Sequence, residues 1–419
     1  MMNGREIVTV LGMALGGFLS LELFLYALLC FLRKDYPWLI MEADENPLFV
    51  RKDLEKFFRH GYDPELGWVR KPGTSGREKG RSGQVEYHIN HVGARLNPGF
   101  EDKPAIISCY GDSFAFCRQV GDAETWPHYL SRLTDSNVLN FGVGNYGMDQ
   151  ALLRMKREYR NCPTKIVILA VVPETISRVL NVWKHYHEYG NIFGFKPRFV
   201  LEGGQLRLVP NVIDEEEKFF KVGEHLSHLR QYDYFYNRKF RADILRFPYT
   251  FSLLKTWRRN LVLVGRLLLK HVFRMLKVRP DYAEYVHDVS VLRRNIEICE
   301  HLYQDAEIET LMVKILEEFA GFAKAEGFSP VFVWLPQQND IKIVQARGSY
   351  YSRFLERARE VLPVVDMTGE FCESDAAAGI YSSDRYGGHL SAHGNERVAE
   401  RIAESLRQGS GCAVARGRA

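Results

Sequence analysis

An apolar run near the start of the chain limits the fold more than any other feature. Residues 7–32 read IVTVLGMALGGFLSLELFLYALLCFL and contain one charged side chain, Glu22. At about 1.5 Å per residue, such a run crosses a hydrocarbon layer of roughly 30 Å as one α-helix. A cleaved signal would have a shorter apolar run and small residues at its end, whereas Arg33 and Lys34 follow here. We predict a membrane anchor over residues 1–40, with an uncleaved or late-cleaved signal as the alternative.

The anchor predicts a single-pass membrane protein, but its flanking charges do not orient it. Arg5 precedes the apolar run and Arg33 and Lys34 follow it, so the excess of basic residues favours neither side. Our hypothesis is that the main domain is extracytoplasmic. Glu22 is costly in lipid when charged, so we expect it either to be protonated or to face another helix.

Composition excludes several classes of protein. The 419 residues allow two to three domains, or one large domain with insertions. A net charge of +4 indicates no nucleic-acid partner. Seven scattered cysteines are too few for a disulfide framework, although one disulfide stays open, and no Cys/His spacing typical of zinc appears. We therefore expect no metal.

Short apolar strands alternate with helices in two separate parts of the chain. The expected strands are 105–110, 138–141, 165–172, 331–335 and 361–366, and the clearest helices are 125–133, 148–159 and one that begins after Asp305. Alternation of this kind predicts a parallel sheet with helices on both faces. The fold class is therefore a three-layer α/β/α sheet with a large insertion and one N-terminal transmembrane helix.

These patterns divide the chain into segments. The predicted segments are the anchor (1–40), a lead-in with short strands (41–104), the first part of the core (105–175), an insertion or cap (176–304), the second part of the core (305–409) and a disordered tail (410–419). Inside the insertion, two short apolar stretches flank Gly203-Gly204, which predicts a β-hairpin.

Two turns at the ends of predicted strands carry candidate chemistry. Gly111-Asp112-Ser113 follows the first strand directly, and a serine on a tight turn at the carboxyl end of a parallel strand faces a cleft. A glycine-rich turn over residues 140–147 follows the second strand, and its glycines let the backbone approach whatever lies beside Ser113. The alternative is an ordinary strand-to-helix turn.

A third candidate lies just before the last helix. Residues 384–389 read DRYGGH, so an aspartate shortly precedes a histidine in a loop that enters a helix. Such an aspartate can fix the histidine tautomer and stabilise the imidazolium. Ser113, Asp384 and His389 are therefore the candidate nucleophile, orienting acid and base.

Together these motifs resemble the SGNH/GDSL hydrolase family over about residues 105–175 and 305–407. The resemblance implies that Ser113 is the nucleophile and His389 its base. It also implies an oxyanion hole made by the backbone N–H groups of Ser113 and of Asn145 or, with a one-residue shift, Gly144. The preceding stretch, from Gly67-Trp68 through residues 90–95 (NHVGAR), is similar to the lead-in of membrane-associated members. No cofactor is implied.

The chain departs from the family pattern in two places. The family's last block has its aspartate three residues before the histidine, where this chain has Tyr386, and Asp384 lies five before. The third block supplies an asparagine to the oxyanion hole, where this chain has Glu174. A carboxylate facing an oxyanion is repulsive, so either Glu174 turns away or is protonated, or another group donates, with Asn181 a candidate by proximity.

The reaction implied is acyl transfer through Ser113. Attack of water on the acyl-enzyme makes a serine esterase, for which we expect an acylated cell-envelope glycan or lipid as substrate. Attack of a sugar hydroxyl makes an O-acyltransferase that moves acyl groups onto a polysaccharide. The departures at Glu174 and Tyr386 leave a third hypothesis open, a non-catalytic glycan-binding protein of the same fold.

A basic stretch stands out in the predicted insertion. Residues 255–279 carry eight Lys and Arg side chains and no acid. At helical spacing, Arg266, Lys270 and Arg274 share one face with other basic residues, and apolar side chains share the opposite face. This pattern is typical of an interfacial helix on anionic lipid, here over 258–279. The alternatives are a solvated basic face over the core, or a basic wall for an acidic substrate.

Overall fold

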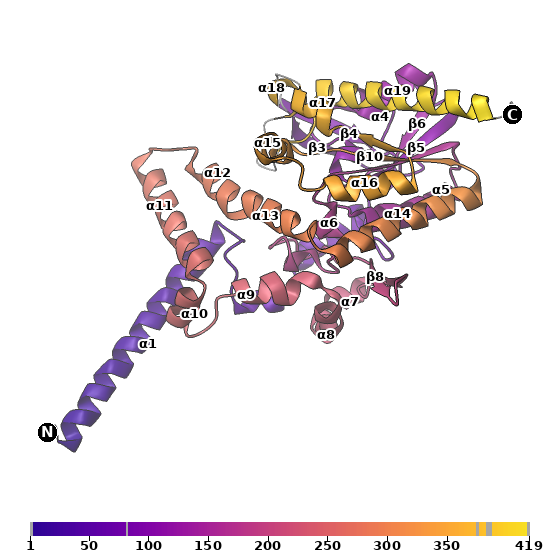
Figure 1. The fold of residues 1–419 in the computed structure, drawn as a ribbon. Helices are drawn as coiled ribbons and strands as arrows, with labels where there is room; N and C mark the ends of the chain where they lie inside the picture. The colour runs from indigo at the N-terminus through magenta and orange to yellow at the C-terminus, as the bar shows by residue number, and fades with distance from the viewer. Residues whose placement is uncertain (1–2, 81–82, 374–376, 383–387, 417–419) are drawn as a thin grey trace. The chain divides into compact units, whose positions relative to one another are not determined.

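The computed structural model describes residues 3–80, 83–373, 377–382 and 388–416. The chain forms two compact units, which are described separately (Figure 1). The anchor unit comprises Met1–Phe49, Trp183–Gly194 and Lys221–Arg294, and the sheet unit comprises Val50–Val182, Phe195–Phe220 and Asn295–Ala419. Residues 195–220, inside the segment predicted as an insertion, therefore belong to the sheet unit.

The sheet unit is built on five parallel strands in the order β11-β10-β7-β5-β6. The strands are β5 (Ala105–Gly111), β6 (Asn137–Asn140), β7 (Ile166–Val171), β10 (Ser329–Trp334) and β11 (Val364–Asp366). They read as apolar runs because helices cover both of their faces. The predicted parallel sheet is confirmed, and its order places the end of β5, where Ser113 follows, near the centre.

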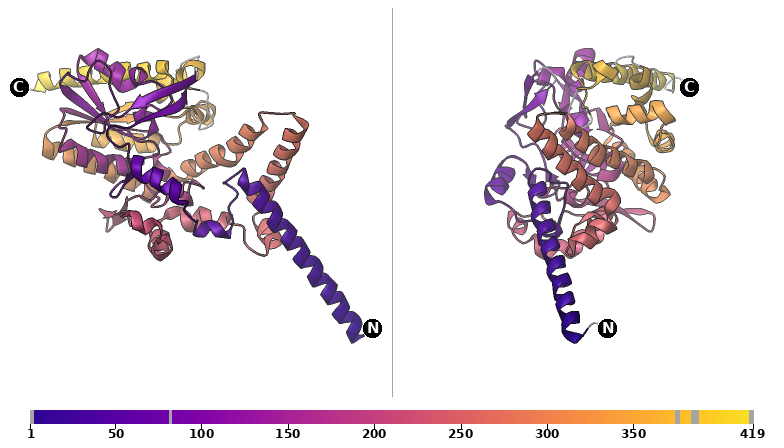
Figure 2. Two further views of the ribbon diagram at one scale, coloured as in Figure 1. Left: turned by 180° about the vertical axis from the view of Figure 1, so that it is seen from behind. Right: turned by 90° about the vertical axis from the view of Figure 1, so that its left-hand side faces the viewer.

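Helices form a layer on each side of this sheet (Figures 1 and 2). The helices α4 (Trp126–Thr134) and α19 (Ala392–Arg416) lie together on one face. The other face carries α5 (Met148–Tyr159), α14 (Ala306–Glu326) and α16 (Ser352–Val361). The three predicted layers are therefore present.

The apolar side chains alternate between these two layers. Val331 and Val333 of β10 pack in one cluster with side chains of α4 and α19. The neighbouring Phe332 lies against Phe354 of α16, with ring centroids 6.2 Å apart. Successive residues of a strand point to opposite faces, so one strand supplies both halves of the core.

The start of α14 and the end of α19 can be compared with the helix ends predicted from sequence. Asp305 caps α14 as predicted, because its carboxylate accepts from the backbone N–H of Glu307 at 3.0 Å and of Ile308 at 3.2 Å. The last helix differs, since α19 runs to Arg416, past Gly409, where we predicted its end and a disordered tail. A glycine costs a helix only about 1 kcal/mol, so Gly409 does not end one by itself.

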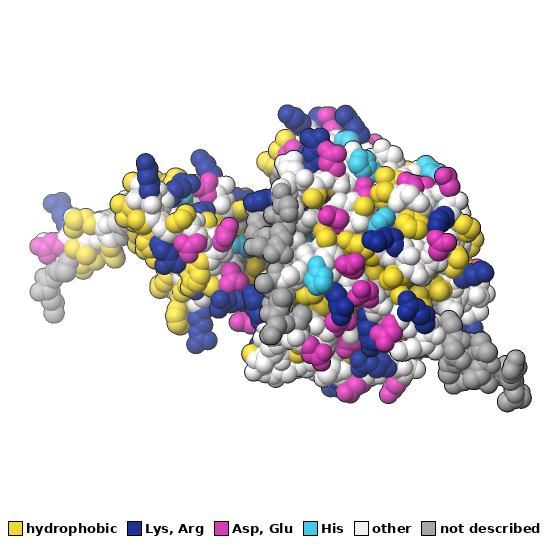
Figure 3. Space-filling view, turned by 90° about the horizontal axis from the view of Figure 1, so that it is seen from above, with side chains coloured by type: hydrophobic (Ala, Val, Ile, Leu, Met, Phe, Trp, Pro, Cys, Tyr) yellow, Lys and Arg dark blue, Asp and Glu magenta, His cyan; other side chains and the backbone are white. Residues whose placement is uncertain are grey.

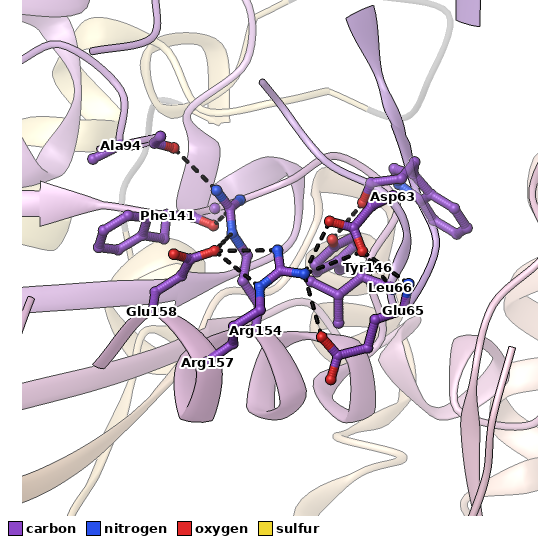
Figure 4. Close-up of polar contacts among 12 residues, drawn as sticks. Asp63, Glu65, Leu66, Ala94, Phe141, Tyr146, Arg154, Arg157 and Glu158 are labelled. Atoms are coloured by element: carbon purple, nitrogen blue, oxygen red, sulfur yellow. Dashed lines mark hydrogen bonds and ion pairs between the residues drawn. The ribbon is translucent and has the colours of Figure 1, made fainter. Parts of the chain in front are cut away.

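Arginine side chains bond the lead-in to the rest of the sheet unit, and Figure 4 shows Arg154 among its partners. It contributes two small antiparallel sheets, β1 (Tyr62–Asp63) with β2 (Gly67–Trp68) and β3 (Ser75–Gly80) with β4 (Gly83–His88). Arg154 of α5 donates to the carbonyl of Phe141 at 2.7 Å and of Gly93 at 3.0 Å. Arg154 therefore bonds to both the lead-in and the turn after β6.

A second buried arginine, Arg95, holds the segment that follows α3 (Ser113–Phe116). Its Nε donates to Asp122 at 2.8 Å, and its Nη atoms donate to three backbone carbonyls. Those carbonyls belong to Phe116, Cys117 and Val120, at 2.6–2.7 Å. With 2% of its surface exposed, Arg95 replaces water as the partner of these groups.

The anchor unit contains the helix α1 (Gly4–Lys34), whose residues Arg5–Lys34 are long and apolar enough to cross a membrane. The end of α1 packs against α10 (Tyr249–Lys255) and α11 (Val262–Leu276). Leu29 and Leu32 of α1 lie in one core cluster with Leu253, Leu263 and Leu267 of those helices. The end of the predicted anchor is thus part of a folded core.

Of the two outcomes expected for Glu22, the structure has it facing another helix. Its carboxylate accepts from the backbone N–H groups of Tyr249 and Thr250, the latter at 3.0 Å, and from the Thr250 hydroxyl. These groups lie at the start of α10, where the first N–H groups of a helix have no partner inside it. Glu22 therefore caps a neighbouring helix.

The basic stretch departs in part from the predicted two-faced helix. It begins as a π-helix, Trp257–Leu261, before α11 starts. Arg259 does not lie on an open basic face, because it donates to the Trp38 carbonyl at 2.7 Å and lies 3.2 Å from Asp243. A π-helix has more residues per turn than an α-helix. Residues 257–261 therefore lie on different faces from those that a constant α-helical spacing through α11 predicts.

We expect Arg95→Met to lower the free energy of unfolding of the full chain by about 3 kcal/mol, because it removes the buried cation that pairs with Asp122 and the donor of three carbonyls. Urea unfolding in detergent measures this loss. The matched control is Arg77→Met, which removes the exposed ion pair with Glu86 and should change stability by less than about 0.5 kcal/mol. Equal effects of the two substitutions would contradict the assignment.

Candidate active site

Ser113 lies where the sequence predicts it, on the turn after strand β5, which neighbours the central strand β7. Asp112 caps the short helix α3 by accepting from the backbone N–H of Phe114 at 2.8 Å. Gly111 is required before it, since a Cβ at that position would lie 1.8 Å from the Ala170 carbonyl oxygen. Gly111 therefore lets the backbone of the turn pack closely against β7. Ser113, the first residue of α3, follows this turn.

His389 lies beside this serine. The His389 Nε2 and the Ser113 Oγ are 3.0 Å apart, within the distance at which a histidine can take a hydroxyl proton. The backbone holds the histidine in place, because its carbonyl accepts from the Ser382 N–H at 2.7 Å. Its ring also lies against Phe114, with centroids 5.1 Å apart. The structure thus brings together two residues that lie far apart in sequence.

Asp384 and Tyr386 lie outside the described residues. The role of Asp384 as the acid that orients His389 therefore stays a hypothesis from the sequence.

The glycine-rich turn after β6 packs directly against the serine turn. The N–H of Phe141 donates to the Cys109 carbonyl at 2.8 Å, and that of Val143 donates to the Gly111 carbonyl at 3.0 Å. A Cβ on Gly142 would lie 2.3 Å from the backbone nitrogen of Phe116, so no larger residue fits here without a shift. The close backbone approach expected from the glycines is therefore present.

A lead-in tryptophan orients the peptide between the two expected oxyanion donors. The Trp68 indole N–H donates to the Gly144 carbonyl at 3.0 Å. In a trans peptide the next N–H, that of Asn145, points the opposite way from this carbonyl. Asn145 has φ of 68°, a left-handed conformation that non-glycine residues rarely adopt and that is concentrated at functional sites. The choice between Asn145 and Gly144 as the donor stays a prediction from the sequence.

Arg178 explains the glutamate at the third block. Its Nη2 donates to the Glu174 carboxylate at 2.6 Å, and its Nη1 donates to the Asp112 carboxylate at 3.2 Å. Glu174 therefore has a cationic partner. Arg178 was not predicted from the sequence, although its position four residues after Glu174 is the spacing of a helical ion pair.

Asp112 is the buried acid of this group. Burial raises the pKa of Asp112, while the nearby Arg178 and the N–H groups of Val172 and Phe114 oppose that rise. The Val172 N–H donates to its Oδ2 at 3.0 Å. Asp112 thus joins the serine turn to the end of β7.

Asn181, the other candidate oxyanion donor, has a fully buried side chain. Neither its amide nitrogen nor its amide oxygen forms a hydrogen bond within the described part of the chain. Its backbone carbonyl accepts from Lys196 Nζ at 3.2 Å. No contact of Asn181 therefore supports a role beside Ser113.

A further buried acid, Asp340, lies close enough to Glu174 and Arg178 to be affected by both charges. Burial raises the pKa of Asp340 to about 7, and Glu174 adds to the rise. The Tyr350 hydroxyl, 2.7 Å away, and the Gln337 N–H, 2.8 Å away, oppose it, as does Arg178. Nothing in the sequence distinguished this aspartate from a surface residue.

Within the described ranges, no three His, Cys, Asp or Glu side chains are grouped so that they could hold a metal ion.

No protein-family model matches the chain, and no curated protein matches it in sequence. Its structure is similar to that of a G-D-S-L family protein from Desulfitobacterium hafniense DCB-2, described as lipolytic, at 10% identity and a TM-score of 0.32, covering 72% of this chain and 99% of that one. It is also similar to the acetyl xylan esterase AlAXEase, at 9% identity and a TM-score of 0.34, covering 72% and 98%.

A lipase/acylhydrolase from Enterococcus faecalis is similar as well, at 10% identity and a TM-score of 0.30, covering 73% of this chain and 96% of that one. The first of the three carries the name of the family that the sequence motifs resemble. These TM-scores are too low to relate individual residues of this chain to those of the three proteins.

Asp340 generates a pH-dependent prediction. Its carboxyl is protonated in the folded protein up to about pH 7 but ionised in the unfolded chain above about pH 4, so folding binds a proton between these values. Protonation of Asp340 therefore stabilises the folded protein at low pH, and this stabilisation is lost as the pH rises toward 7. We expect Asp340→Asn to gain stability relative to wild type by about 1 kcal/mol per pH unit from pH 5 to pH 7.

Urea unfolding of both proteins at several pH values measures this difference. Parallel stability curves for wild type and Asp340→Asn would show that Asp340 binds no proton on folding.

Proposed function

We propose that this chain is a membrane-anchored serine esterase of the SGNH/GDSL type. The observation that carries the proposal is the 3.0 Å contact between Ser113 Oγ and His389 Nε2 at the carboxyl end of a parallel sheet. In open parallel sheets, ligands bind outside the carboxyl ends of the strands. The motifs around both residues resemble the same family, which supports the pairing independently.

In the proposed reaction, His389 Nε2 takes the Ser113 proton while the serine oxygen attacks an ester carbonyl. The N–H groups of Ser113 and Asn145 stabilise the oxyanion of the tetrahedral intermediate. His389 then protonates the leaving alcohol, and an acyl-serine remains. Water, deprotonated by His389, releases the acid. Asp384 orients the histidine in this scheme.

We further propose that the substrate is an acylated glycan or lipid of the cell envelope and that the sheet unit is extracytoplasmic. Membrane anchoring by α1 supports this class of substrate, because it confines the enzyme to the envelope. A signal that is removed would not be part of the mature fold, whereas Leu29 and Leu32 of α1 lie in the core of the anchor unit. Their burial supports retention of the helix.

Covalent labelling tests the nucleophile. We expect a fluorophosphonate probe to label the wild-type chain and not Ser113→Ala, since the probe reacts with a serine activated by a neighbouring base. Mass spectrometry should locate the label on Ser113. His389→Ala should slow labelling by at least about 100-fold, because it removes the base.

Ser113→Ala should retain the stability of the wild type, because the substitution removes one oxygen. A folded wild-type protein that takes up no probe would refute the serine-esterase proposal.

The indole N–H of Trp68 should support catalysis by holding the Gly144–Asn145 peptide. We expect Trp68→Phe, which keeps an aromatic ring beside Tyr146, to lower kcat for p-nitrophenyl acetate by about 10- to 100-fold at nearly unchanged KM. A poorly oriented donor weakens only the interaction made in the transition state.

The matched control is Trp183→Phe, which loses an indole bond to the Ile192 carbonyl at 2.9 Å without touching this peptide. If both variants lose the same activity, Trp68 has no special role in orienting the donor.

A further inference from the structure

Glu22 lies in the C-terminal half of α1. It precedes Arg33 by 11 positions, which corresponds to about 16 Å along a helix, or half of a hydrocarbon layer of roughly 30 Å. The chain that meets Glu22 at this level is the start of α10, at Tyr249 and Thr250. Tyr249 also lies against Tyr26 of α1, with ring centroids 5.8 Å apart.

The chain on both sides of Tyr249 and Thr250 bonds to residues that follow α1 in sequence. On one side, the Leu245 N–H donates to the Ile40 carbonyl at 3.0 Å. On the other side, Arg259 donates to the Trp38 carbonyl at 2.7 Å. Residues 247–257, which we call the re-entrant segment, therefore lie between two contacts with residues 38–40 and meet Glu22 of α1 in between.

The re-entrant segment exposes large apolar side chains. They are Phe247, Phe251, Leu254 and Trp257, which are 54–66% exposed. Leu15, Phe18 and Leu19 of α1 are exposed in the same way. Large apolar groups gathered on adjoining elements are unusual on a surface that faces water. The two elements thus present apolar surface of the same kind.

Charge is confined to the edges of the re-entrant segment. Arg246 precedes it and pairs with Glu45 at 2.8 Å, while Arg258 and Arg259 follow it. Its one charged residue, Lys255, lies within a turn of that second edge, from which a long side chain can reach polar headgroups. In the left-hand part of Figure 3, where α1 and α11 lie, hydrophobic side chains are interspersed with basic and acidic ones.

The first N–H groups of α10 have hydrogen-bond partners that do not depend on water. The first N–H groups of a helix need partners, and lipid offers none. Here Glu22 accepts from two of them and from the Thr250 hydroxyl, and Pro248 just before them has no N–H. A helix start on a water-exposed surface needs no such acceptor, because water would serve.

We propose that the re-entrant segment is embedded in the membrane leaflet that holds the C-terminal half of α1, in contact with lipid acyl chains and docked on α1 through Glu22. This inference rests on the proposed anchoring by α1. A protein partner could also cover apolar side chains, but the basic edges and the shared level with α1 favour lipid.

Photo-crosslinking of the full chain tests this placement. The photoreactive residue p-benzoylphenylalanine replaces one phenylalanine at a time, in protein reconstituted into vesicles of phosphatidylethanolamine and phosphatidylglycerol. Three exposed phenylalanines provide the comparison, namely Phe251 in the re-entrant segment, Phe18 in α1 and Phe220 in the sheet unit. We expect lipid adducts by mass spectrometry at positions 18 and 251 and none at position 220.

Each other outcome has a distinct meaning. Adducts at position 18 without adducts at 251, or equal adducts at 251 and 220, would overturn the re-entrant segment and leave the anchor intact. No adduct at position 18 would refute the anchor and the re-entrant segment together. None of these results bears on the Ser113 chemistry, which the fluorophosphonate probe tests.

Two substitutions test the docking residue. Glu22→Gln keeps an acceptor oxygen for the N–H groups of α10, whereas Glu22→Leu removes it. We expect the position-251 adduct to persist in Glu22→Gln and to be lost in Glu22→Leu, with the position-18 adduct present in both. Unchanged crosslinking in Glu22→Leu would show that Glu22 does not hold the segment in the bilayer.

Discussion

The arrangement around Ser113 depends on the buried carboxylate of Asp112. Its two oxygens accept from the backbone N–H of Phe114 in the serine turn and of Val172 at the end of β7. One residue thus binds the ends of two neighbouring central strands together. Because Ser113 is the next residue, the position of its hydroxyl is set by the contacts of Asp112. A buried carboxylate is stable only with such partners.

Arg178 extends this constraint to the rest of the site. It pairs with Asp112 and Glu174, and it also donates to the Tyr146 carbonyl at 3.3 Å, in the turn that carries Asn145. A single guanidinium therefore connects the three segments that the family resemblance describes as separate blocks. In this context, a glutamate at the third block is a partner for a buried cation and not an isolated charge beside the nucleophile.

The sheet was predictable from sequence because its strands are short apolar runs between glycine turns and capped helices, such as the one that begins after Asp305. Ser113 could be singled out because it follows such a strand directly, and His389 because it lies in a recognisable motif just before the last helix. Arg178, Trp68 and Asp340 were not, since their importance comes from partners that only the folded chain brings close. The π turn before α11 was equally hidden, because a constant helical spacing was assumed.

Glu22 and Asp112 show the same physical solution in two different surroundings. Both are carboxylates removed from water, and both accept backbone N–H groups at the start of a helix, α10 for Glu22 and α3 for Asp112. In each case an unpaired donor and an unpaired acceptor would be costly separately, and together they satisfy each other. An acid inside an apolar run is therefore informative, because it requires a second element with free donors. For Glu22 that element is the start of α10, more than 220 residues further along the chain.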